Sequence, residues 1–213
     1  MAAKTIKKEL GLYVSSQNSK LGRTIPTVNF PPIVYCNPNA PCTKKGCYAC
    51  KGRMSCPNVM KTMEQNRKLW EKDPNEFFQQ LEGYLQYYPT NFFRWFSSGD
   101  IPSEDFLCRM CLLADNHVIT KFLCFTKKFD IVDGYLKSGN TIPINLTIIY
   151  SCWDTFIPEN PYNFPMAYVK FKEMESKIPE NAFKCSKFCG KCVFGEKNCW
   201  ALKHGEAVVF DKH

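Results

Sequence analysis

Apolar runs and helix-patterned segments alternate along the middle of this chain, and the alternation limits the possible folds more than any other feature. Four short runs rich in aromatic and β-branched residues are typical of strands. They are residues 91–97, 121–126, 144–150 and 166–171. Between the first three runs lie residues 103–117 and 130–139, whose apolar positions recur at helical spacing. Because strands alternating with helices form βαβ units, the sequence predicts an α/β protein with a largely parallel sheet. Doubly wound sheets and incomplete βα-barrels both fit this pattern.

The region before the alternation is less regular. Residues 1–30 are expected to form an extended, polar lead-in, since the paired prolines that follow exclude a helix. The run "IVYC" (33–36) predicts a short buried strand. Two helices are expected next, over residues 56–72 and 73–88. The second begins with an aspartate that can cap it and a proline suited to its first turn.

Composition divides the chain into three regions. An extended lead-in (1–30) precedes an α/β region with an N-terminal cysteine loop (31–175), and a cysteine-rich segment (176–213) ends the chain. The last region is polar and has no helix or strand pattern. We therefore expect it to be organised by bound metal and packed on the same domain.

Thirteen cysteines in 213 residues raise the question of their chemical state. The N-terminus has no apolar segment of the kind found in signal peptides, and no apolar run is long enough for a membrane span. We therefore expect a cytoplasmic protein without membrane contact. Thiols stay reduced in that compartment, which disfavours disulfides and favours metal binding or redox chemistry.

Eight cysteines fall into two groups near the ends of the chain. The groups are Cys36, Cys42, Cys47 and Cys50, and Cys185, Cys189, Cys192 and Cys199. Gaps of two to six residues let one loop present several sulfurs to one centre, as iron–sulfur clusters require. We predict one or two [4Fe-4S] clusters, with zinc as the alternative because two C-x2-C pairs are present. Cys36, Cys50 and Cys56 are each either ligands or bystanders.

The remaining cysteines have a simpler interpretation. Cys108, Cys111, Cys124 and Cys152 lie in apolar helix or strand patterns and are expected in the core.

One strand ends in "SSGD", which places Ser98, Gly99 and Asp100 at the carboxyl edge of the predicted sheet. Ligands bind at this edge in open α/β sheets and in βα-barrels. These three residues are therefore candidates for cofactor binding. The alternative is a plain turn in which Asp100 starts the next helix.

Positive charge is concentrated in the first third of the chain. Residues 1–72 hold thirteen Lys and Arg against three acids, whereas residues 73–213 hold fifteen against seventeen. Such a balance is compatible with nucleic-acid binding, but we favour counter-charge for an anionic cluster.

These motifs together resemble the bacteriophage "gene product 88" family. The resemblance rests on the N-terminal cysteines with "CYACKGR", on "FRWFSSGD" and "FTKK", and on the terminal cysteine group. It implies conserved roles for Cys36, Cys42 and Cys47, while family members often lack a cysteine at the position of Cys50. A phage protein would act in the host cytoplasm, on a substrate or host protein that the sequence does not identify.

The layout is more remotely similar to radical S-adenosylmethionine proteins, in which a cysteine triplet follows the first strand and a Gly-containing motif ends the second. This similarity implies a partial βα-barrel and an S-adenosylmethionine site in which Gly99 and Asp100 face the methionine amine. The corresponding function is a radical S-adenosylmethionine-like reaction. The alternative is a non-catalytic metal protein, acting as an electron carrier or a host-interaction module.

Overall fold

A computed structural model describes residues 11–16, 18–44, 46–153, 155–171 and 177–211. Its centre is an eight-stranded sheet with the order β1-β2-β3-β4-β5-β6-β8-β7. Only the β1–β2 pair is antiparallel, and every other pairing is parallel. The prediction of an α/β protein with a largely parallel sheet is therefore confirmed. The strands follow almost in chain order, and β1 and β7 each pair on one side only, so a closed barrel is not present among the described strands.

The elements of the first half carry the helical part of the fold. In chain order they are β1 (Val14–Ser15), β2 (Thr27–Val28), the 3-10 turns η1 (Pro41–Thr43), η2 (Tyr48–Cys50) and η3 (Gly52–Ser55), α2 (Pro57–Lys72), α3 (Pro74–Tyr87), β3 (Phe92–Trp95) and α4 (Glu104–Asn116). Both predicted helices between residues 56 and 88 are confirmed. Asp73 caps α3, accepting a hydrogen bond of 3.0 Å from the backbone N–H of Glu76.

The second half completes the sheet. Its elements are β4 (Lys121–Thr126), α5 (Phe129–Lys137), β5 (Leu146–Ser151), β6 (Met166–Lys170), β7 (Phe183–Lys184), α6 (Cys189–Cys192), η5 (Cys199–Ala201) and β8 (Ala207–Asp211). The four strand-like runs of the alternating region all form strands, as predicted. The terminal segment, which has no strand pattern in the sequence, contributes β7 and β8 to the same sheet.

The prediction of a strand at residues 33–36 is wrong. These residues form turns that follow the paired prolines, and Ile33 has a positive φ of 77°. The side chains of Ile33 and Val34 are about half exposed, at 46% and 51%. The strand that precedes the cysteine loop is instead β2, within the region expected to be an extended lead-in.

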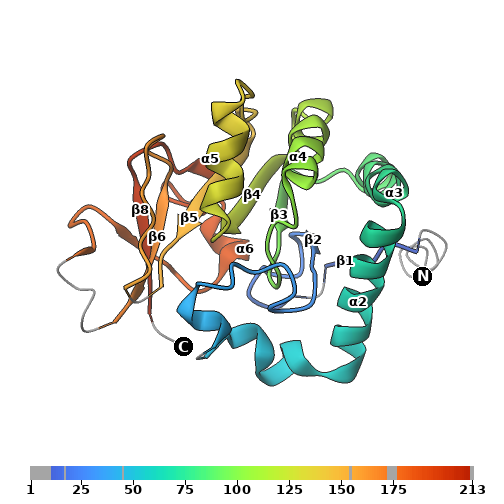
Figure 1. Ribbon diagram of the computed structural model, residues 1–213, viewed down its shortest axis with the longest axis horizontal. Helices are drawn as coiled ribbons and strands as arrows, with labels where there is room; N and C mark the ends of the chain where they lie inside the picture. The colour runs from blue at the N-terminus through green and yellow to red at the C-terminus, as the bar shows by residue number, and fades with distance from the viewer. Residues whose placement is uncertain (1–10, 17, 45, 154, 172–176, 212–213) are drawn as a thin grey trace.

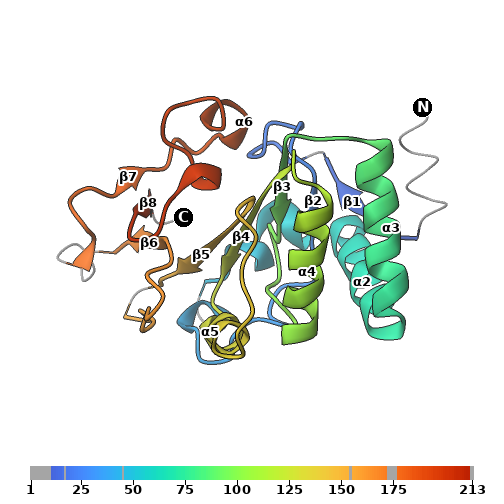
Figure 2. The same ribbon diagram turned by 90° about the horizontal axis from the view of Figure 1, so that it is seen from above.

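The two faces of the sheet are covered differently, as Figures 1 and 2 show. Helices α4 and α5 pack on one face, where Phe93, Trp95 and Phe122 belong to the large aromatic core. Residues that point the other way, such as Leu123 in β4 and Ile149 in β5, pack with the terminal cysteine segment on the other face. Period-two alternation of the strands therefore separates a helical core from a cysteine-lined one.

Candidate metal centres

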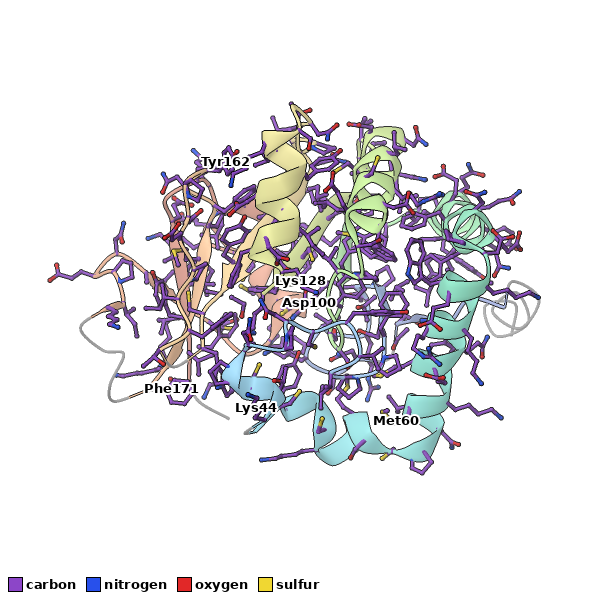
Figure 3. The ribbon with its side chains drawn as sticks, in the orientation of Figure 1. Lys44, Met60, Asp100, Lys128, Tyr162 and Phe171 are labelled. Carbon is purple, nitrogen blue, oxygen red and sulfur yellow. The ribbon has the colours of Figure 1, made fainter. Side chains whose placement is uncertain are left out.

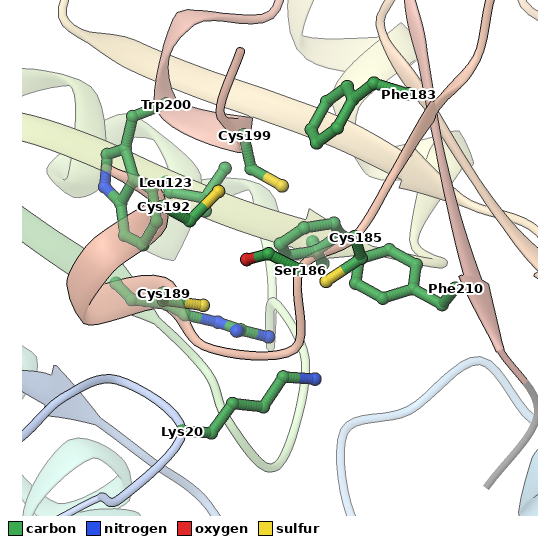
Figure 4. Close-up of a pocket in the computed structure, with 12 residues that line it drawn as sticks. Lys20, Leu123, Phe183, Cys185, Ser186, Cys189, Cys192, Cys199, Trp200 and Phe210 are labelled. Atoms are coloured by element: carbon green, nitrogen blue, oxygen red, sulfur yellow. The ribbon is translucent and has the colours of Figure 1, made fainter. Parts of the chain in front are cut away.

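The four terminal cysteines line one small hollow against the second face of the sheet (Figure 4). Cys185 directly follows β7, Cys189 and Cys192 are the first and last residues of α6, and Cys199 begins η5. Their sulfur atoms point toward a common space. The structure thus brings together all four residues of the predicted C-terminal group.

Backbone contacts with the N-terminal lead-in hold this segment in place. The N–H of Cys189 donates to the carbonyl of Lys20 at 2.8 Å. Beside this bond the backbones of Gly22 and Gly190 touch, since a Cβ on Gly22 would lie 2.6 Å from the Cα of Gly190. On the other side, the N–H of Cys185 donates to the carbonyl of Val209 in β8 at 2.9 Å. Glycine is required at positions 22 and 190 because no side chain fits between these two backbone segments.

Two cations, Lys20 and Arg94, line the same hollow. Arg94 projects from β3 onto the second face of the sheet, where its guanidinium lies 4.9 Å from the ring centroid of Phe125. Its Nε is buried and has no hydrogen-bond partner. Among the described residues neither cation forms a salt bridge with a carboxylate. The hollow therefore combines four thiols with two positive charges that have no anionic partner.

Burial controls the protonation of these groups. It raises the pKa of the Cys189 and Cys199 thiols, and it lowers the pKa of the Lys20 ammonium, which Arg94 lowers further. Lys20 and Arg94 act in the opposite sense on the pKa of Cys189, because a cation favours the thiolate. A metal ion that binds here must displace thiol protons, and the two cations favour that displacement.

The present placement of the side chains limits what the hollow admits. Its atom-free space is about 350 Å³, counting the part open to solvent, but only about 10 Å³ is available to the centre of a water molecule. Within the described ranges, no three Cys, His, Asp or Glu side chains are placed to hold a single metal ion. A group larger than one water molecule requires the thiols to turn outward.

The N-terminal cysteine loop lies over the carboxyl edge of the sheet. Tyr48 Oη donates to the carbonyl of Ser97, just after β3, at 2.5 Å. Asn37 Nδ2 donates to the carbonyl of Lys127, just after β4, at 2.9 Å. These two bonds tie both ends of the loop to neighbouring strand ends. The loop thus lies at the edge where parallel α/β sheets bind ligands.

Three thiols of this loop, those of Cys36, Cys42 and Cys47, interact with one another. Burial is the main cause that raises the pKa of Cys36 to about 11, and the neighbouring charges of Asp100, Cys47 and Cys42 contribute. Burial also raises the pKa of Cys42, and the nearby ammonium of Lys127 offsets part of that increase. The structure therefore groups the three cysteines that the family resemblance singles out.

Cys50 and Cys56 occupy more exposed positions. Burial and the adjacent Cys47 thiol both raise the pKa of Cys50, so Cys50 lies next to the group of three. Cys56 precedes α2, and its thiol donates to the carbonyl of Gly52 at 4.0 Å. Cys50 is close enough to supply a fourth sulfur, whereas no hydrogen bond among the described residues joins Cys56 to the group of three.

Asp100, labelled near the centre of Figure 3, links the ends of two strands by hydrogen bonds. Its carboxylate accepts hydrogen bonds from Thr126 Oγ1 at 2.6 Å, from the N–H of Ile101 at 2.8 Å and from the N–H of Lys127 at 2.9 Å. The alternative in which Asp100 starts the next helix is wrong, because Ser103 caps α4. Burial raises the pKa of Asp100, although these donors favour its ionised form.

The two residues before Asp100 have different environments. Gly99 has a φ of 89°, and a Cβ there would lie 2.8 Å from the Cβ of Phe30. The hydroxyl of Ser98 is buried and has no hydrogen-bond partner. Ser98 therefore keeps a free donor at the strand end, while most of the acceptor capacity of Asp100 is already occupied.

The other cysteines lie where the sequence predicts them. Cys111, Cys124 and Cys152 are buried, and Cys108 is half-buried against the aromatic core. Burial raises the pKa of Cys111 and of Cys152 to about 12 each. These thiols remain neutral and act as small apolar side chains.

Sequence reasoning does not single out Lys20, Arg94 or Lys127. Lys127 follows β4 and donates from Nζ to Ser151 Oγ at 3.0 Å, which joins the ends of β4 and β5 beside the N-terminal thiols. The motif "FRWF" does carry a signal for Arg94: strand alternation places its side chain on the other face of the sheet from the two flanking aromatic residues. Lys20 has no comparable signal.

The fold and these sites define a class: a cysteine-rich α/β protein with a mostly parallel sheet and two separate groups of thiols. The chain belongs to the bacteriophage family described as Gene product 88, whose sequence profile matches residues 3–206. The resemblance noted from the motifs is thereby confirmed. No curated protein and no solved structure is significantly similar to the chain. None of the described helices is both long and apolar enough to span a bilayer.

Proposed function

We propose that this protein binds two iron–sulfur clusters, one at each group of thiols. The observation that carries the proposal is the terminal hollow, in which four thiols from β7, α6 and η5 surround one space beside Lys20 and Arg94. A metal centre held by four thiolates has a net charge of about −2. Two cations without carboxylate partners match that charge.

The choice between iron–sulfur and zinc rests on spacing. A single zinc ion held by four thiolates has the same charge as a cluster, so charge does not separate the two. Zinc requires sulfurs gathered within about 2.3 Å of one ion. Cys185, Cys189 and Cys192 have C-x3-C-x2-C spacing, with Cys199 as a fourth thiol. A triplet with a fourth cysteine supports a multi-iron cluster, which holds its ligands at the corners of a larger core.

The N-terminal site supports the more specific proposal of a radical S-adenosylmethionine-like enzyme. Three thiols would leave one iron of a [4Fe-4S] cluster without a protein ligand. When bound there, S-adenosylmethionine would supply radical chemistry after reductive cleavage. In this proposal Ser98 donates a hydrogen bond to the cofactor, while Gly99, packed against Phe30, and Asp100 hold the strand end in shape. Strands in nearly sequential order with helices on one face are also what a partial βα-barrel requires.

Cys50 favours the alternative, a non-catalytic electron carrier or host-interaction module. Its thiol lies beside Cys47. A fourth thiolate at this site would complete the coordination of the cluster and exclude S-adenosylmethionine. A closed site of this kind transfers electrons without binding a substrate.

Metal analysis of anaerobically purified protein tests the first proposal. We expect iron and acid-labile sulfide, with broad brown absorbance, and replacing Cys189 with Ser should lower the iron content. Stoichiometric zinc with no iron after reconstitution would refute the iron–sulfur assignment.

Calorimetric titration of S-adenosylmethionine into the reconstituted protein separates the enzyme from the alternative. Binding that is lost in Cys42→Ala and retained in Cys111→Ala supports the radical enzyme. If wild-type protein with a full complement of iron shows no binding, the non-catalytic metal protein takes its place.

A further inference from the structure

Arg94 is the least expected residue on the second face of the sheet. Leu123 lies opposite it on β4 and Thr27 lies opposite it on β2. Arg94 is half-buried, and no hydrogen bond or carboxylate contact of its side chain is present among the described residues, although its Nε is buried. A buried donor without an acceptor costs free energy, so this residue is suited to an anionic partner in the hollow.

The neighbours of Arg94 narrow the identity of that partner. Cys189, Cys192 and Cys199 line the hollow with it. Lys20 lies on the same side and adds a second cation, its Nζ 5.4 Å from the ring centroid of Phe210. The hollow therefore places two cationic side chains beside four thiols. A metal that binds these sulfurs as thiolates would supply the matching negative charge.

We propose that Arg94 is the charge partner and hydrogen-bond donor of the metal–thiolate group in the terminal hollow. The proposal rests on the proposed function and adds a specific role for one residue. In the metal-free protein the buried Nε of Arg94 has no acceptor, and the guanidinium lies against the ring of Phe125. In the loaded protein the same side chain faces a group of about −2 and stabilises it. Removing Arg94 should therefore weaken the metal-loaded protein more than the metal-free protein.

The test compares Arg94→Met with Arg94→Lys and with the control Arg109→Met. Methionine keeps much of the volume of arginine and removes the charge. Arg109 is a half-buried helix residue that bonds Asp105 at 2.9 Å, and it is remote in sequence from both cysteine groups. Urea unfolding is measured on metal-free and on reconstituted full-length protein, under anaerobic conditions. Iron retention is measured against a chelator.

We expect Arg94→Met to change the folding equilibrium constant of the metal-free protein by about twofold or less, because the side chain is half-buried there and its Nε makes no hydrogen bond that the substitution would remove. The same substitution should lower the affinity for iron about 10- to 100-fold, the usual effect of removing a partner of the ligands. It should also lower the midpoint potential of the terminal cluster, because a nearby cation favours the reduced, more negative form. A tenfold change in the equilibrium constant for reduction of the cluster corresponds to about 59 mV for one electron. Arg94→Lys should restore most of the potential, and Arg109→Met should leave all three quantities unchanged.

The outcomes separate this inference from the proposed function. If Cys189→Ser retains as much iron as wild type, the terminal hollow holds no cluster and both proposals fail. If Cys189→Ser loses iron while Arg94→Met behaves like Arg109→Met, the cluster stands and the role of Arg94 is refuted. If Arg94→Met does not fold, Lys20→Met supplies the same comparison of the two states, and equal effects on the metal-free and the loaded protein also refute the inference.

Discussion

Replacing Asp100 tests whether this carboxylate acts mainly by joining two strand ends. Thr126, Ile101 and Lys127 each donate one hydrogen bond to it, at 2.6, 2.8 and 2.9 Å. The side chain is almost fully buried, with 5% of the residue exposed. Asp100→Ala leaves all three donors without an acceptor. Asp100→Asn keeps the shape, but its amide group can face only some of them as an acceptor.

The two substitutions should differ in magnitude. Each buried donor left unpaired costs about 1–3 kcal/mol, and water entering the vacated space relieves part of the sum. We therefore expect Asp100→Ala to lower the free energy of unfolding by about 3–5 kcal/mol. In Asp100→Asn the amide oxygen still accepts from Thr126 and Ile101 while its NH₂ opposes the N–H of Lys127. With one mispaired donor, we expect the free energy of unfolding to fall by about 1–3 kcal/mol.

The assay is anaerobic urea unfolding at neutral pH, followed by tryptophan fluorescence and circular dichroism, with the metal content of each sample measured in parallel. Asp105→Ala, an exposed carboxylate on α4, is the control and should change the free energy of unfolding by about 0.5 kcal/mol or less. The reasoning is refuted if Asp100→Ala is as stable as this control, or if Asp100→Asn is as destabilised as Asp100→Ala.

Three further substitutions test other parts of the structure. Cys189→Ser should lose metal and stability together, whereas Cys111→Ser should be a core defect of about 1–3 kcal/mol with normal iron content; equal iron in both would contradict the terminal site. Gly99→Ala should lower the free energy of unfolding by at least about 1–2 kcal/mol, since its φ of 89° disfavours a side chain and a Cβ would lie 2.8 Å from that of Phe30; a neutral effect in denaturant titration would show that this strand end adapts. Trp200→Phe removes a buried 3.0 Å bond from Nε1 to a β3 carbonyl and should cost about 1–3 kcal/mol in the same titration, so a loss below about 0.5 kcal/mol would contradict it.

Local signals explain why the middle of the fold could be predicted. Residues 121–126 have a strand composition and form β4 over the same residues. Helix α3 begins at a proline after its capping aspartate, as its sequence indicates. Such elements carry their own caps and periodicity, so tertiary contacts are not needed to recognise them.

The ends of the sheet could not be predicted in this way. Strands β1 and β2 have two residues each, too few to show alternation, and β1 is fixed by Asn66, whose Oδ1 accepts from the N–H of Tyr13 at 2.8 Å. The run at 33–36 is apolar enough for a strand, but the turn that follows two prolines leaves Ile33 and Val34 exposed. Whether such short segments form strands depends on pairing partners that are far away in the sequence.

The candidate sites also combine features with a local sequence signal and features without one. Cysteine spacing is local, and it predicts which thiols of the terminal group meet in one hollow. The cations beside them come from β3 and from the lead-in, far away in the sequence. The sequence predicts Asp100 at the end of a strand, which the structure confirms. Two of its three hydrogen-bond donors, Thr126 and Lys127, lie at the end of a different strand, β4. Contacts of this kind depend on sheet topology and have no sequence signal of their own.

The touching backbones of Gly22 and Gly190 also impose an order of events during biosynthesis. Residues near 20 leave the ribosome long before residues near 190, so the terminal hollow cannot close while the chain is being made. Cluster insertion at this hollow must therefore follow translation of Cys199, the last of its four cysteines. A ribosome-stalled chain ending before Cys185 would therefore present Lys20 and Arg94 to solvent, with no thiols yet beside them.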